Sequence, residues 1–263
     1  MGLTSRMALL LWALHAPLVA ADLPEVQGRG ALRVLVVLDA RRPEFFAQSP
    51  VLPGFDHELI EGVARAHRLK LQVVALPSWD DLVPALLAGK GDVIVGGFRD
   101  TEARRKSVAF SAETFPTRTV VVTLKPHRAV KTLAELRAEK VGVMKGTSMA
   151  EAVAAAGVPE SNLDDGIAAW SYVDALRDGR VTAVAWSVER AFPAQRQDPS
   201  LQLGLYLDKP GSLAFAVRRE DTKLLAALNE HIGGVRRSGS WSRLVVKYFG
   251  ESALELVKQA RTE

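Results

Sequence analysis

Residues 92–111 carry side chains that suit the binding of a small acid. The stretch begins with an apolar run at 93–95, short enough for a buried strand. It continues into Gly96 and Gly97, where backbone can approach another group because no Cβ intervenes. Arg104 follows on the first turn of an expected helix. Ligands bind beyond the carboxyl ends of strands in open α/β sheets, and a guanidinium there can hold a carboxylate with two parallel hydrogen bonds.

The same arginine has a plainer interpretation, because Arg104, Arg105 and Lys106 are three adjacent cations. Such runs commonly form the solvated face of a helix. Asp100 or Thr101 could cap that helix in either case. The segments around the stretch decide between the two interpretations, since they determine whether Arg104 lies in a cleft or on an open surface.

Alternating strand and helix patterns surround this stretch and predict an α/β fold with two lobes. The first set of expected elements, typical of a parallel doubly wound sheet, comprises strands at 32–38, 71–76 and 93–95 and helices at 54–66 and after Ser78. The second set comprises strands at 119–124, 141–144 and 181–186 and helices at 133–136, 149–156 and 172–177. A strand at 213–218 would cross back, and helices at 223–238 and 241–249 would complete the first lobe.

The composition bounds the classes of function to consider. Of the 263 residues, 48% are hydrophobic, which suits a folded core, and the net charge of +4 comes from scattered cations that do not predict a nucleic-acid partner. Residues 1–21 have the positive, apolar and small-residue regions of a secretory signal peptide, with cleavage expected before Asp22. The chain has no cysteine, which excludes disulfides and lipid attachment at the mature N-terminus. These features predict an unlipidated protein free in the periplasm.

The order of motifs resembles the bacterial extracellular solute-binding proteins of family three, the polar amino-acid-binding proteins of ABC importers. The resemblance covers nearly all of the mature chain. It rests on Gly54-Phe55-Asp56-His57-Glu58-Leu59, on the block from Ser78 to Ile94, on the spacing of Thr101, Arg104, Lys106, Val108, Phe110 and Ser111, on Val141-Gly142-Val143 with Lys145-Gly146-Thr147, and on Gly239-Ser240-Trp241 with Lys247-Tyr248-Phe249-Gly250.

The resemblance implies a two-lobed periplasmic binding protein (Venus flytrap) fold, in which each lobe holds a mixed, mostly parallel sheet flanked by helices. Lobe one would comprise residues 22–117 and 214–263 and lobe two residues 118–213, with hinges near 115–118 and 212–215. A small anionic or zwitterionic ligand would bind between the lobes, which close on it, and an inner-membrane ABC permease would receive it. The protein would act as a monomer without metal or cofactor.

The resemblance also implies which residues contact the ligand. Arg104 matches the arginine that binds the ligand's α-carboxylate, and Gly97 lies where the family presents backbone groups. Thr147 and Ser148 match a turn at a helix N-terminus that supplies hydroxyls and amides, and helix N-termini attract anions.

Aromatic residues are candidates for an apolar pocket wall. We expect Phe45, Trp79 and Phe98 to form it, although ordinary core packing explains Trp79 and Phe98 equally well. Trp170, Trp186 and Trp241 are expected to be structural.

The chain departs from the family where the ligand's ammonium should bind. Ser187 stands at the position of the family's aspartate, and a hydroxyl cannot neutralise a buried ammonium. Glu189 could substitute, although a shift of two positions changes where a side chain points.

Two arginines replace other residue types that the family places near the ligand. Arg99 stands where a small hydroxyl residue is usual, and Arg42 stands near a position that is commonly aromatic. If both face the cleft with Arg104, three cations line it, which favours an acid without a free amine or with more than one negative charge. The alternative is that Arg42 and Arg99 point to solvent or pair with Glu44 and Asp100.

Three functions remain open at this level. The favoured one is a binding protein for an importer, and an accessory or sensory protein that keeps the fold without transport is the second. A dehydratase of the cyclohexadienyl type would need a general acid or base in the cleft. Because none of His57, His67, His127 and His231 lies on a predicted cleft loop, we expect no catalytic residue and no enzyme.

Overall fold

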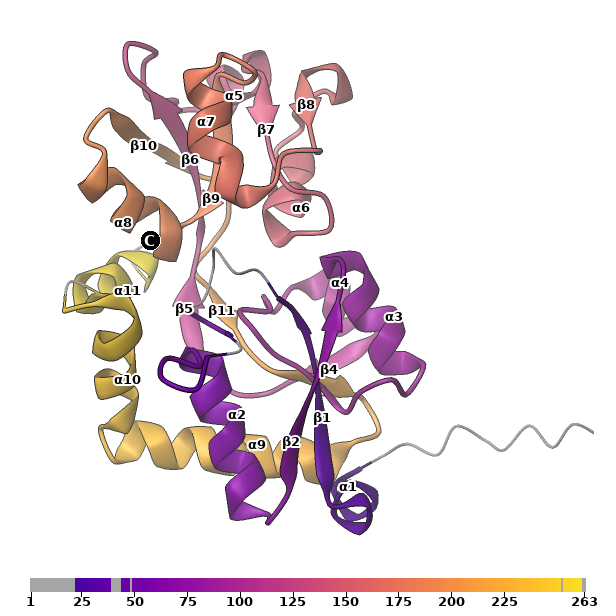
Figure 1. The fold of residues 1–263 in the computed structure, drawn as a ribbon. Coiled ribbons are helices and arrows are strands. Elements are labelled where there is room, and N and C mark those ends of the chain that lie inside the picture. Colours follow the sequence, from indigo (N-terminus) through magenta and orange to yellow (C-terminus); the bar gives the residue numbers. More distant parts are fainter. Residues whose placement is uncertain (1–21, 39–43, 48, 252, 262–263) are drawn as a thin grey trace, which may run out of the picture.

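The computed structural model describes residues 22–38, 44–47, 49–251 and 253–261. The expected signal peptide at 1–21 and Arg42 lie outside these residues. Two five-stranded sheets form separate lobes, and two crossover segments join them (Figure 1). Within the described residues, no helix is both long and apolar enough to cross a bilayer.

The first sheet has the order β2-β1-β3-β12-β4. Its strands are β1 (Ala31–Val37), β2 (Lys70–Leu76), β3 (Val93–Ile94), β4 (Val108–Phe110) and β12 (Ala216–Arg218). β1 pairs parallel with β2 and β3, whereas β12 pairs antiparallel with β3 and β4. The helices of this lobe are α1 (Leu23–Arg29), α2 (Phe55–Ala66), α3 (Leu82–Leu87), α4 (Glu102–Arg105), α9 (Thr222–Arg237) and α10 (Ser240–Phe249).

The second sheet has the order β10-β6-β9-β7-β8. Its strands are β6 (Thr119–Leu124), β7 (Val141–Gly142), β8 (Leu163–Asp164), β9 (Ala183–Ser187) and β10 (Leu201–Tyr206), and its helices are α5 (Leu133–Ala138), α6 (Ser148–Ala155), α7 (Tyr172–Arg177) and α8 (Val188–Gln197). β7 pairs parallel with β8 and β9, whereas β6 pairs antiparallel with β9 and β10. In the first sheet β12 runs antiparallel to the other four strands, and in the second sheet β6 does so. This confirms two mixed, mostly parallel sheets.

The lobes are joined by β5 (Phe115–Thr117) and β11 (Gly211–Leu213), which pair antiparallel. Gly211 is opposite Thr117 and Leu213 is opposite Phe115. These strands lie in the waist between the sheets (Figure 1), in the two segments where hinges are expected. Because each crossing is a short extended segment, a small backbone rotation there can swing a whole lobe.

Apolar alternation in the central strands builds a core on each face of each sheet. Val34 and Val36 of β1 face the cluster that includes α2 and α9, whereas Leu35 faces the cluster that includes α3. In the second lobe Val120 and Val121 of β6 likewise face opposite clusters. Because both faces of each sheet are covered, consecutive residues of a central strand are all buried, and its sequence is a continuous apolar run.

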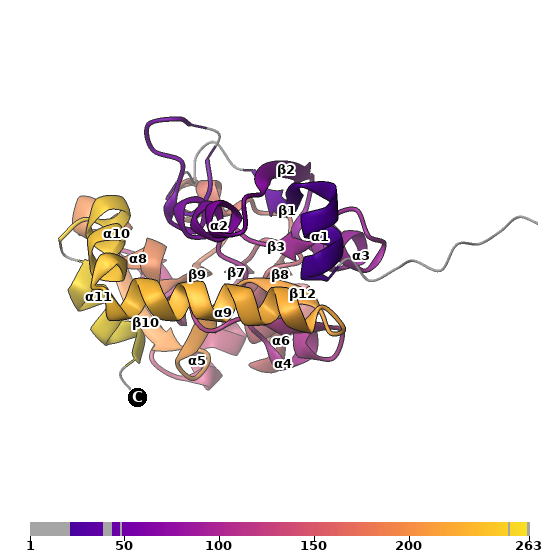
Figure 2. The ribbon, with the colours of Figure 1, turned by 90° about the horizontal axis from the view of Figure 1, so that it is seen from below.

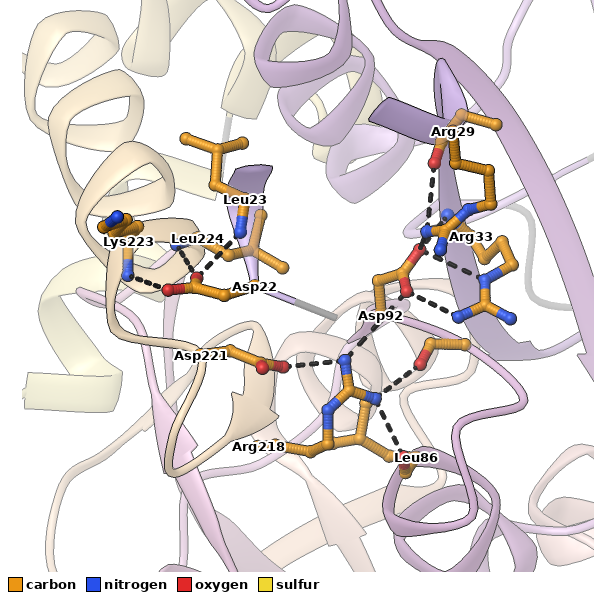
Figure 3. Close-up of polar contacts among 12 residues, drawn as sticks. Asp22, Leu23, Arg29, Arg33, Leu86, Asp92, Arg218, Asp221, Lys223 and Leu224 are labelled. Carbon is orange, nitrogen blue, oxygen red and sulfur yellow. Dashed lines mark hydrogen bonds and ion pairs between the residues drawn. The ribbon is translucent and has the colours of Figure 1, made fainter. Parts of the chain in front are cut away.

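A buried ionic network anchors the strand that leads to the site. The Asp92 carboxylate, at 0% exposure, accepts hydrogen bonds from the Arg33 backbone N–H and Nη2, both at 2.8 Å. Figure 3 shows Arg29 and Arg33 on one side of Asp92 and Arg218 on the other, and Arg218 pairs with Asp221 at 2.8 Å. A buried carboxylate is stable only when paired and hydrogen-bonded in this way, so the network holds the start of β3 in place.

The C-terminal helices extend from lobe one toward lobe two. Figure 2 shows α9 crossing the lower end of the molecule from α1 to α10, with α2 against it. α11 (Ala253–Arg261) then packs against β5 and α8, and Ala260 is buried in the core of the second lobe. The sequence patterns did not predict α11, α8 or β10. The boundaries at 117/118 and 213/214 remain a prediction, and α11 lies across the junction between the two lobes.

Candidate ligand-binding site

Two adjoining cavities lie between segments that follow the strands of both sheets. The smaller, about 30 Å³, is lined by Trp79, Gly97, Arg99, Arg104, Thr117, Thr147, Ser148, Met149, Ser187, Glu189 and Leu213. The larger, about 270 Å³, shares Trp79, Gly97 and Glu189 with it and adds mainly apolar residues, among them Phe45, Phe46, Met144 and Trp170. Most of the predicted site residues therefore meet at one place.

Arg104 is held rigidly in the smaller cavity. Thr101 caps α4 by accepting a hydrogen bond from the Arg104 backbone N–H at 3.3 Å. The side chain is 11% exposed, and it donates from Nη1 to the Arg99 carbonyl at 2.8 Å and from Nη2 to the Gly146 carbonyl at 3.2 Å. Burial lowers the pKa of Arg104 from its ordinary value, but a guanidinium keeps its charge in proteins. The nearest acidic group in the described part of the chain is Glu151, whose Oε1 lies 3.8 Å from Arg104 Nε, and Asp80 also acts on the charge.

Phe98 contacts the guanidinium of Arg104 with its ring face and does not line either cavity. The guanidinium carbon lies 4.1 Å from the Phe98 ring centroid, a cation–π contact. Phe98 is 1% exposed and stacks on Trp79, with centroids 6.5 Å apart and planes 4° from parallel. The expectation of a pocket wall is thus wrong for Phe98, because the turn after β3 directs its side chain into the core. Trp79 does line both cavities.

Gly96 and Gly97 form a turn that only glycine adopts readily, with φ of +92° and +79°. Their N–H groups donate to Asp56 Oδ2 at 3.0 and 2.7 Å, so the first turn of α2, which contains Asp56, holds this glycine turn in place. A Cβ at Gly97 would lie 3.3 Å from the Phe45 ring. Since its N–H is engaged, the Gly97 carbonyl oxygen is the backbone group left to face a ligand.

Asp56 should make the free energy of unfolding depend on pH. Burial raises its pKa from 3.8 to about 6, so the folded state holds a proton that the unfolded chain releases between those values. Its contribution to stability is therefore full below about pH 4 and is lost as the pH rises through 6. Relative to Asp56→Asn, which cannot titrate, the wild type should lose roughly 2 kcal/mol of unfolding free energy between pH 4 and 7. Urea titrations at several pH values measure this, and a pH-independent difference would contradict it.

The N-terminus of α6 faces the same cavity. Thr147 caps the helix, accepting from the Ala150 N–H at 3.4 Å, and donates its hydroxyl to the Met144 carbonyl at 2.6 Å. Its hydroxyl is therefore committed to the turn. Ser148 is buried, and its hydroxyl makes only a weak 3.6 Å contact to Met149 Sδ. The first N–H groups of a helix have no partner within it, so this end suits a carboxylate.

Glu189 supplies the acid that Ser187 cannot. β9 ends at Ser187 and α8 begins at once, which places Glu189 in the first helical turn with 6% exposure. One carboxylate oxygen accepts from Thr117 Oγ1 at 2.8 Å, and the side chain lines both cavities. Ser187 is 4% exposed, and its hydroxyl has no partner among the described residues. Glu189 was only an alternative from the sequence because no helix was expected directly after the strand. The Val-Glu-Arg-Ala run after Ser187 is the signal for that helix.

Arg99 faces the cavity but is not an unpaired cation. It is 8% exposed, and its Nη1 lies 3.0 Å from Asp208 Oδ2 and 2.9 Å from Thr119 Oγ1. The acids considered as partners are engaged elsewhere, since Asp100 pairs with Arg105 and Glu44 with Arg190. The positive charge expected from Arg99 is thus neutralised by an acid from the second lobe, so Arg99 gives no preference for an amine-free ligand.

The remaining aromatic residues divide between core and cavity. Phe45 borders the larger cavity, yet it is 4% exposed and packs against the rings of Phe55, Phe115 and Phe249. Trp170, expected to be structural, is 45% exposed and lines the larger cavity, so that expectation is wrong.

The other two tryptophans are buried. Trp241 donates from Nε1 to the Thr114 carbonyl at 2.6 Å, and Trp186 packs edge-on against Tyr172.

Direct contacts across the cleft show that the lobes are closed. Arg104 of lobe one reaches the Gly146 carbonyl of lobe two, and Glu44 pairs with Arg190 on α8. A Cβ on Gly146 would lie 2.6 Å from Asp80 Oδ1. The site therefore lies between two lobes that touch across it and leave it partly open, as in proteins that bind a small molecule in a cleft.

Two mixed sheets, two crossover strands and a cleft between the lobes define the class of two-lobed solute-binding proteins. The chain belongs to the bacterial extracellular solute-binding proteins, family 3, whose model matches residues 32–251.

Known proteins with similar chains fit this assignment. The probable histidine-binding protein of Campylobacter jejuni is 29% identical over 213 residues, which cover 79% of this chain and 80% of that protein. A variant of ArgBP from T. maritima has a TM-score of 0.76 and 30% identity, covering 87% of this chain and 99% of its own. An ancestral amino-acid-binding protein, a precursor of cyclohexadienyl dehydratase, has a TM-score of 0.74 and 25% identity, covering 86% of this chain and 98% of its own.

Proposed function

We propose that this protein captures a free α-amino acid as its zwitterion in the cleft and delivers it, as a periplasmic monomer, to an inner-membrane ABC permease. One observation carries the proposal: an arginine from lobe one whose side chain is 11% exposed, Arg104, and a buried glutamate from lobe two, Glu189, line the same small cavity. An α-carboxylate and an α-ammonium on one carbon are the complementary pair of charges. Each lobe then provides one partner, so the ligand bridges them and favours closure.

Neighbouring groups complete this assignment of roles. The ligand carboxylate would receive hydrogen bonds from Arg104 and from the first N–H groups of α6 at Ser148. Its ammonium would donate to Glu189, to the Gly97 carbonyl and to the unpartnered Ser187 hydroxyl. The ammonium is then neutralised and hydrogen-bonded, which a buried charge requires. The ligand side chain would extend into the larger cavity beside Trp79.

Thermal unfolding against a ligand panel tests the function. The mature protein would be unfolded and refolded to remove carried-over ligand, then melted with each amino acid and with the corresponding 2-hydroxy acids. A ligand at about a hundred times its Kd adds roughly 2.7 kcal/mol, which raises the Tm by several degrees. We expect large shifts with one or a few amino acids and much smaller shifts with their hydroxy analogues, which bind more weakly. Shifts confined to amine-free acids would overturn the proposal.

Transport is distinguished from the two alternative functions by further measurements. An accessory or sensory protein would bind the amino acid without stimulating uptake through a reconstituted permease. Catalysis is the second alternative, because one similar protein is the ancestral precursor of a dehydratase. We infer none here, because the Glu189 carboxylate is assigned to a stable charge pair, and incubation of the protein with its ligand should yield no product.

A further inference from the structure

Arg99 contacts both segments through which the chain crosses between the lobes. It belongs to lobe one, where its backbone forms an isolated antiparallel bridge with Leu213 at the end of β11. Its guanidinium Nη1 donates to Thr119 Oγ1 at 2.9 Å and lies 3.0 Å from Asp208 Oδ2. Thr119 follows β5, and Asp208 precedes β11. One buried side chain therefore contacts both crossover segments at their lobe-two ends.

The groups around Arg99 are arranged to receive it. Asp208 Oδ1 accepts from the Thr119 N–H at 2.9 Å, and the Asp208 carbonyl accepts from Arg118 Nε at 2.7 Å. Position 211 is glycine, and a Cβ there would lie 2.8 Å from Arg99 Nη2. The two crossover segments are thus tied together on the lobe-two side, with space on β11 for an arginine from lobe one.

The backbone of Arg99 is also part of the ligand site. Its carbonyl oxygen accepts from Arg104 Nη1 at 2.8 Å, which orients the guanidinium that we assign to the ligand carboxylate. Arg99 therefore connects Arg104 to the hinge through a carbonyl on one side and a guanidinium on the other. The path is short and consists of hydrogen bonds from groups that are mostly buried.

We propose that Arg99 is a positioning residue that couples the carboxylate-binding Arg104 to the hinge and stabilises the closed orientation of the lobes. This role rests on the proposed function as far as Arg104 is concerned, whereas the contact with the hinge stands on its own. Opening the lobes separates Arg99 from Thr119 and Asp208, because they move with different bodies. Their charge-assisted contacts thus belong to the closed state and shift the equilibrium toward it.

Distance measurements on the ligand-free protein test this coupling directly. Because the chain has no cysteine, Lys90→Cys and Glu160→Cys, both exposed and one on each lobe, give unique sites for spin labels. In Arg99→Met and in Asp208→Asn we expect the mean distance between the labels to lengthen. The apparent affinity for the amino acid should fall about ten-fold, because the affinity scales with the fraction of closed protein. The double variant should bind the amino acid no more weakly than whichever single variant binds it less tightly.

The matched control is Arg105→Met, which removes an exposed ion pair with Asp100 inside lobe one and should change neither distance nor affinity. Arg99→Lys should give an intermediate result, since it keeps the charge but not the planar fork. An unchanged distance in Arg99→Met and Asp208→Asn, or fully additive effects in the double variant, would overturn the proposal. If the wild type binds no amino acid, the proposed function fails, and the ligand-free distances still decide the role of Arg99.

Discussion

Arg104→Met should weaken amino-acid binding about a thousand-fold. The guanidinium is largely shielded from solvent, stacked on Phe98 and oriented by the Arg99 and Gly146 carbonyls, so it is preorganised for a carboxylate. Removing it leaves the ligand carboxylate desolvated with only the N-terminus of α6 as a partner, and loss of one member of a buried charge pair costs about 2–5 kcal/mol. Titration calorimetry on the refolded protein measures the loss.

Two comparisons make this result specific. Arg104→Lys should recover part of the affinity, because an ammonium keeps the charge but cannot donate two parallel hydrogen bonds. Arg105→Met removes the neighbouring cation, which is 64% exposed and paired with Asp100, and should bind normally. Equal losses in the Arg104 and Arg105 variants would favour a general electrostatic effect and would contradict a carboxylate site at Arg104.

Glu189→Gln should weaken binding of the amino acid on the order of a few hundred-fold and leave the corresponding 2-hydroxy acid within a few-fold. The substitution keeps the size of the side chain and an oxygen for the Thr117 hydroxyl, but it removes the negative charge facing the ammonium. A buried ammonium without a counter-charge is costly, whereas a neutral hydroxyl is not affected in this way. Calorimetric titration of both ligands into both proteins gives the four affinities.

A rescue variant distinguishes charge from structural damage. Ser187→Asp in the Glu189→Gln background places a carboxylate at the end of β9, in the buried position whose hydroxyl now lacks a partner. It should restore preference for the amino acid over its hydroxy analogue. Glu189→Gln losing affinity equally for both ligands would show that Glu189 does not recognise the ammonium.

The pairing of Arg99 with Asp208 explains why Arg99 does not make the site selective for ligands with excess negative charge. Arg99 is balanced by Asp208, so Arg104 and Glu189 are the opposite charges that the lining of the smaller cavity offers to a ligand. The cleft is then close to neutral with a zwitterion in place. This agrees with membership in a family with amino-acid-binding relatives.

The sequence by itself determined the fold, because fold signals are local and repeated. Apolar runs in β1, β2 and β6 predicted the strands, and the capping threonines 101 and 147 marked helix starts. Gly97 and Arg104, which the sequence motifs marked as site residues, line one small cavity, and their contact with a ligand remains a prediction. Short elements such as β8, and helices without a clear start signal such as α8, were missed.

Only the tertiary structure decided which charges face one another. Arg99 and Asp208 lie far apart in the chain and meet because the two crossover segments run side by side. The direction of Glu189 depends on the turn from β9 into α8, and the fate of Phe98 depends on Trp79 stacking against it. Side-chain partners of this kind arise from the packing of distant segments, and residue type and local periodicity carry no information about that packing.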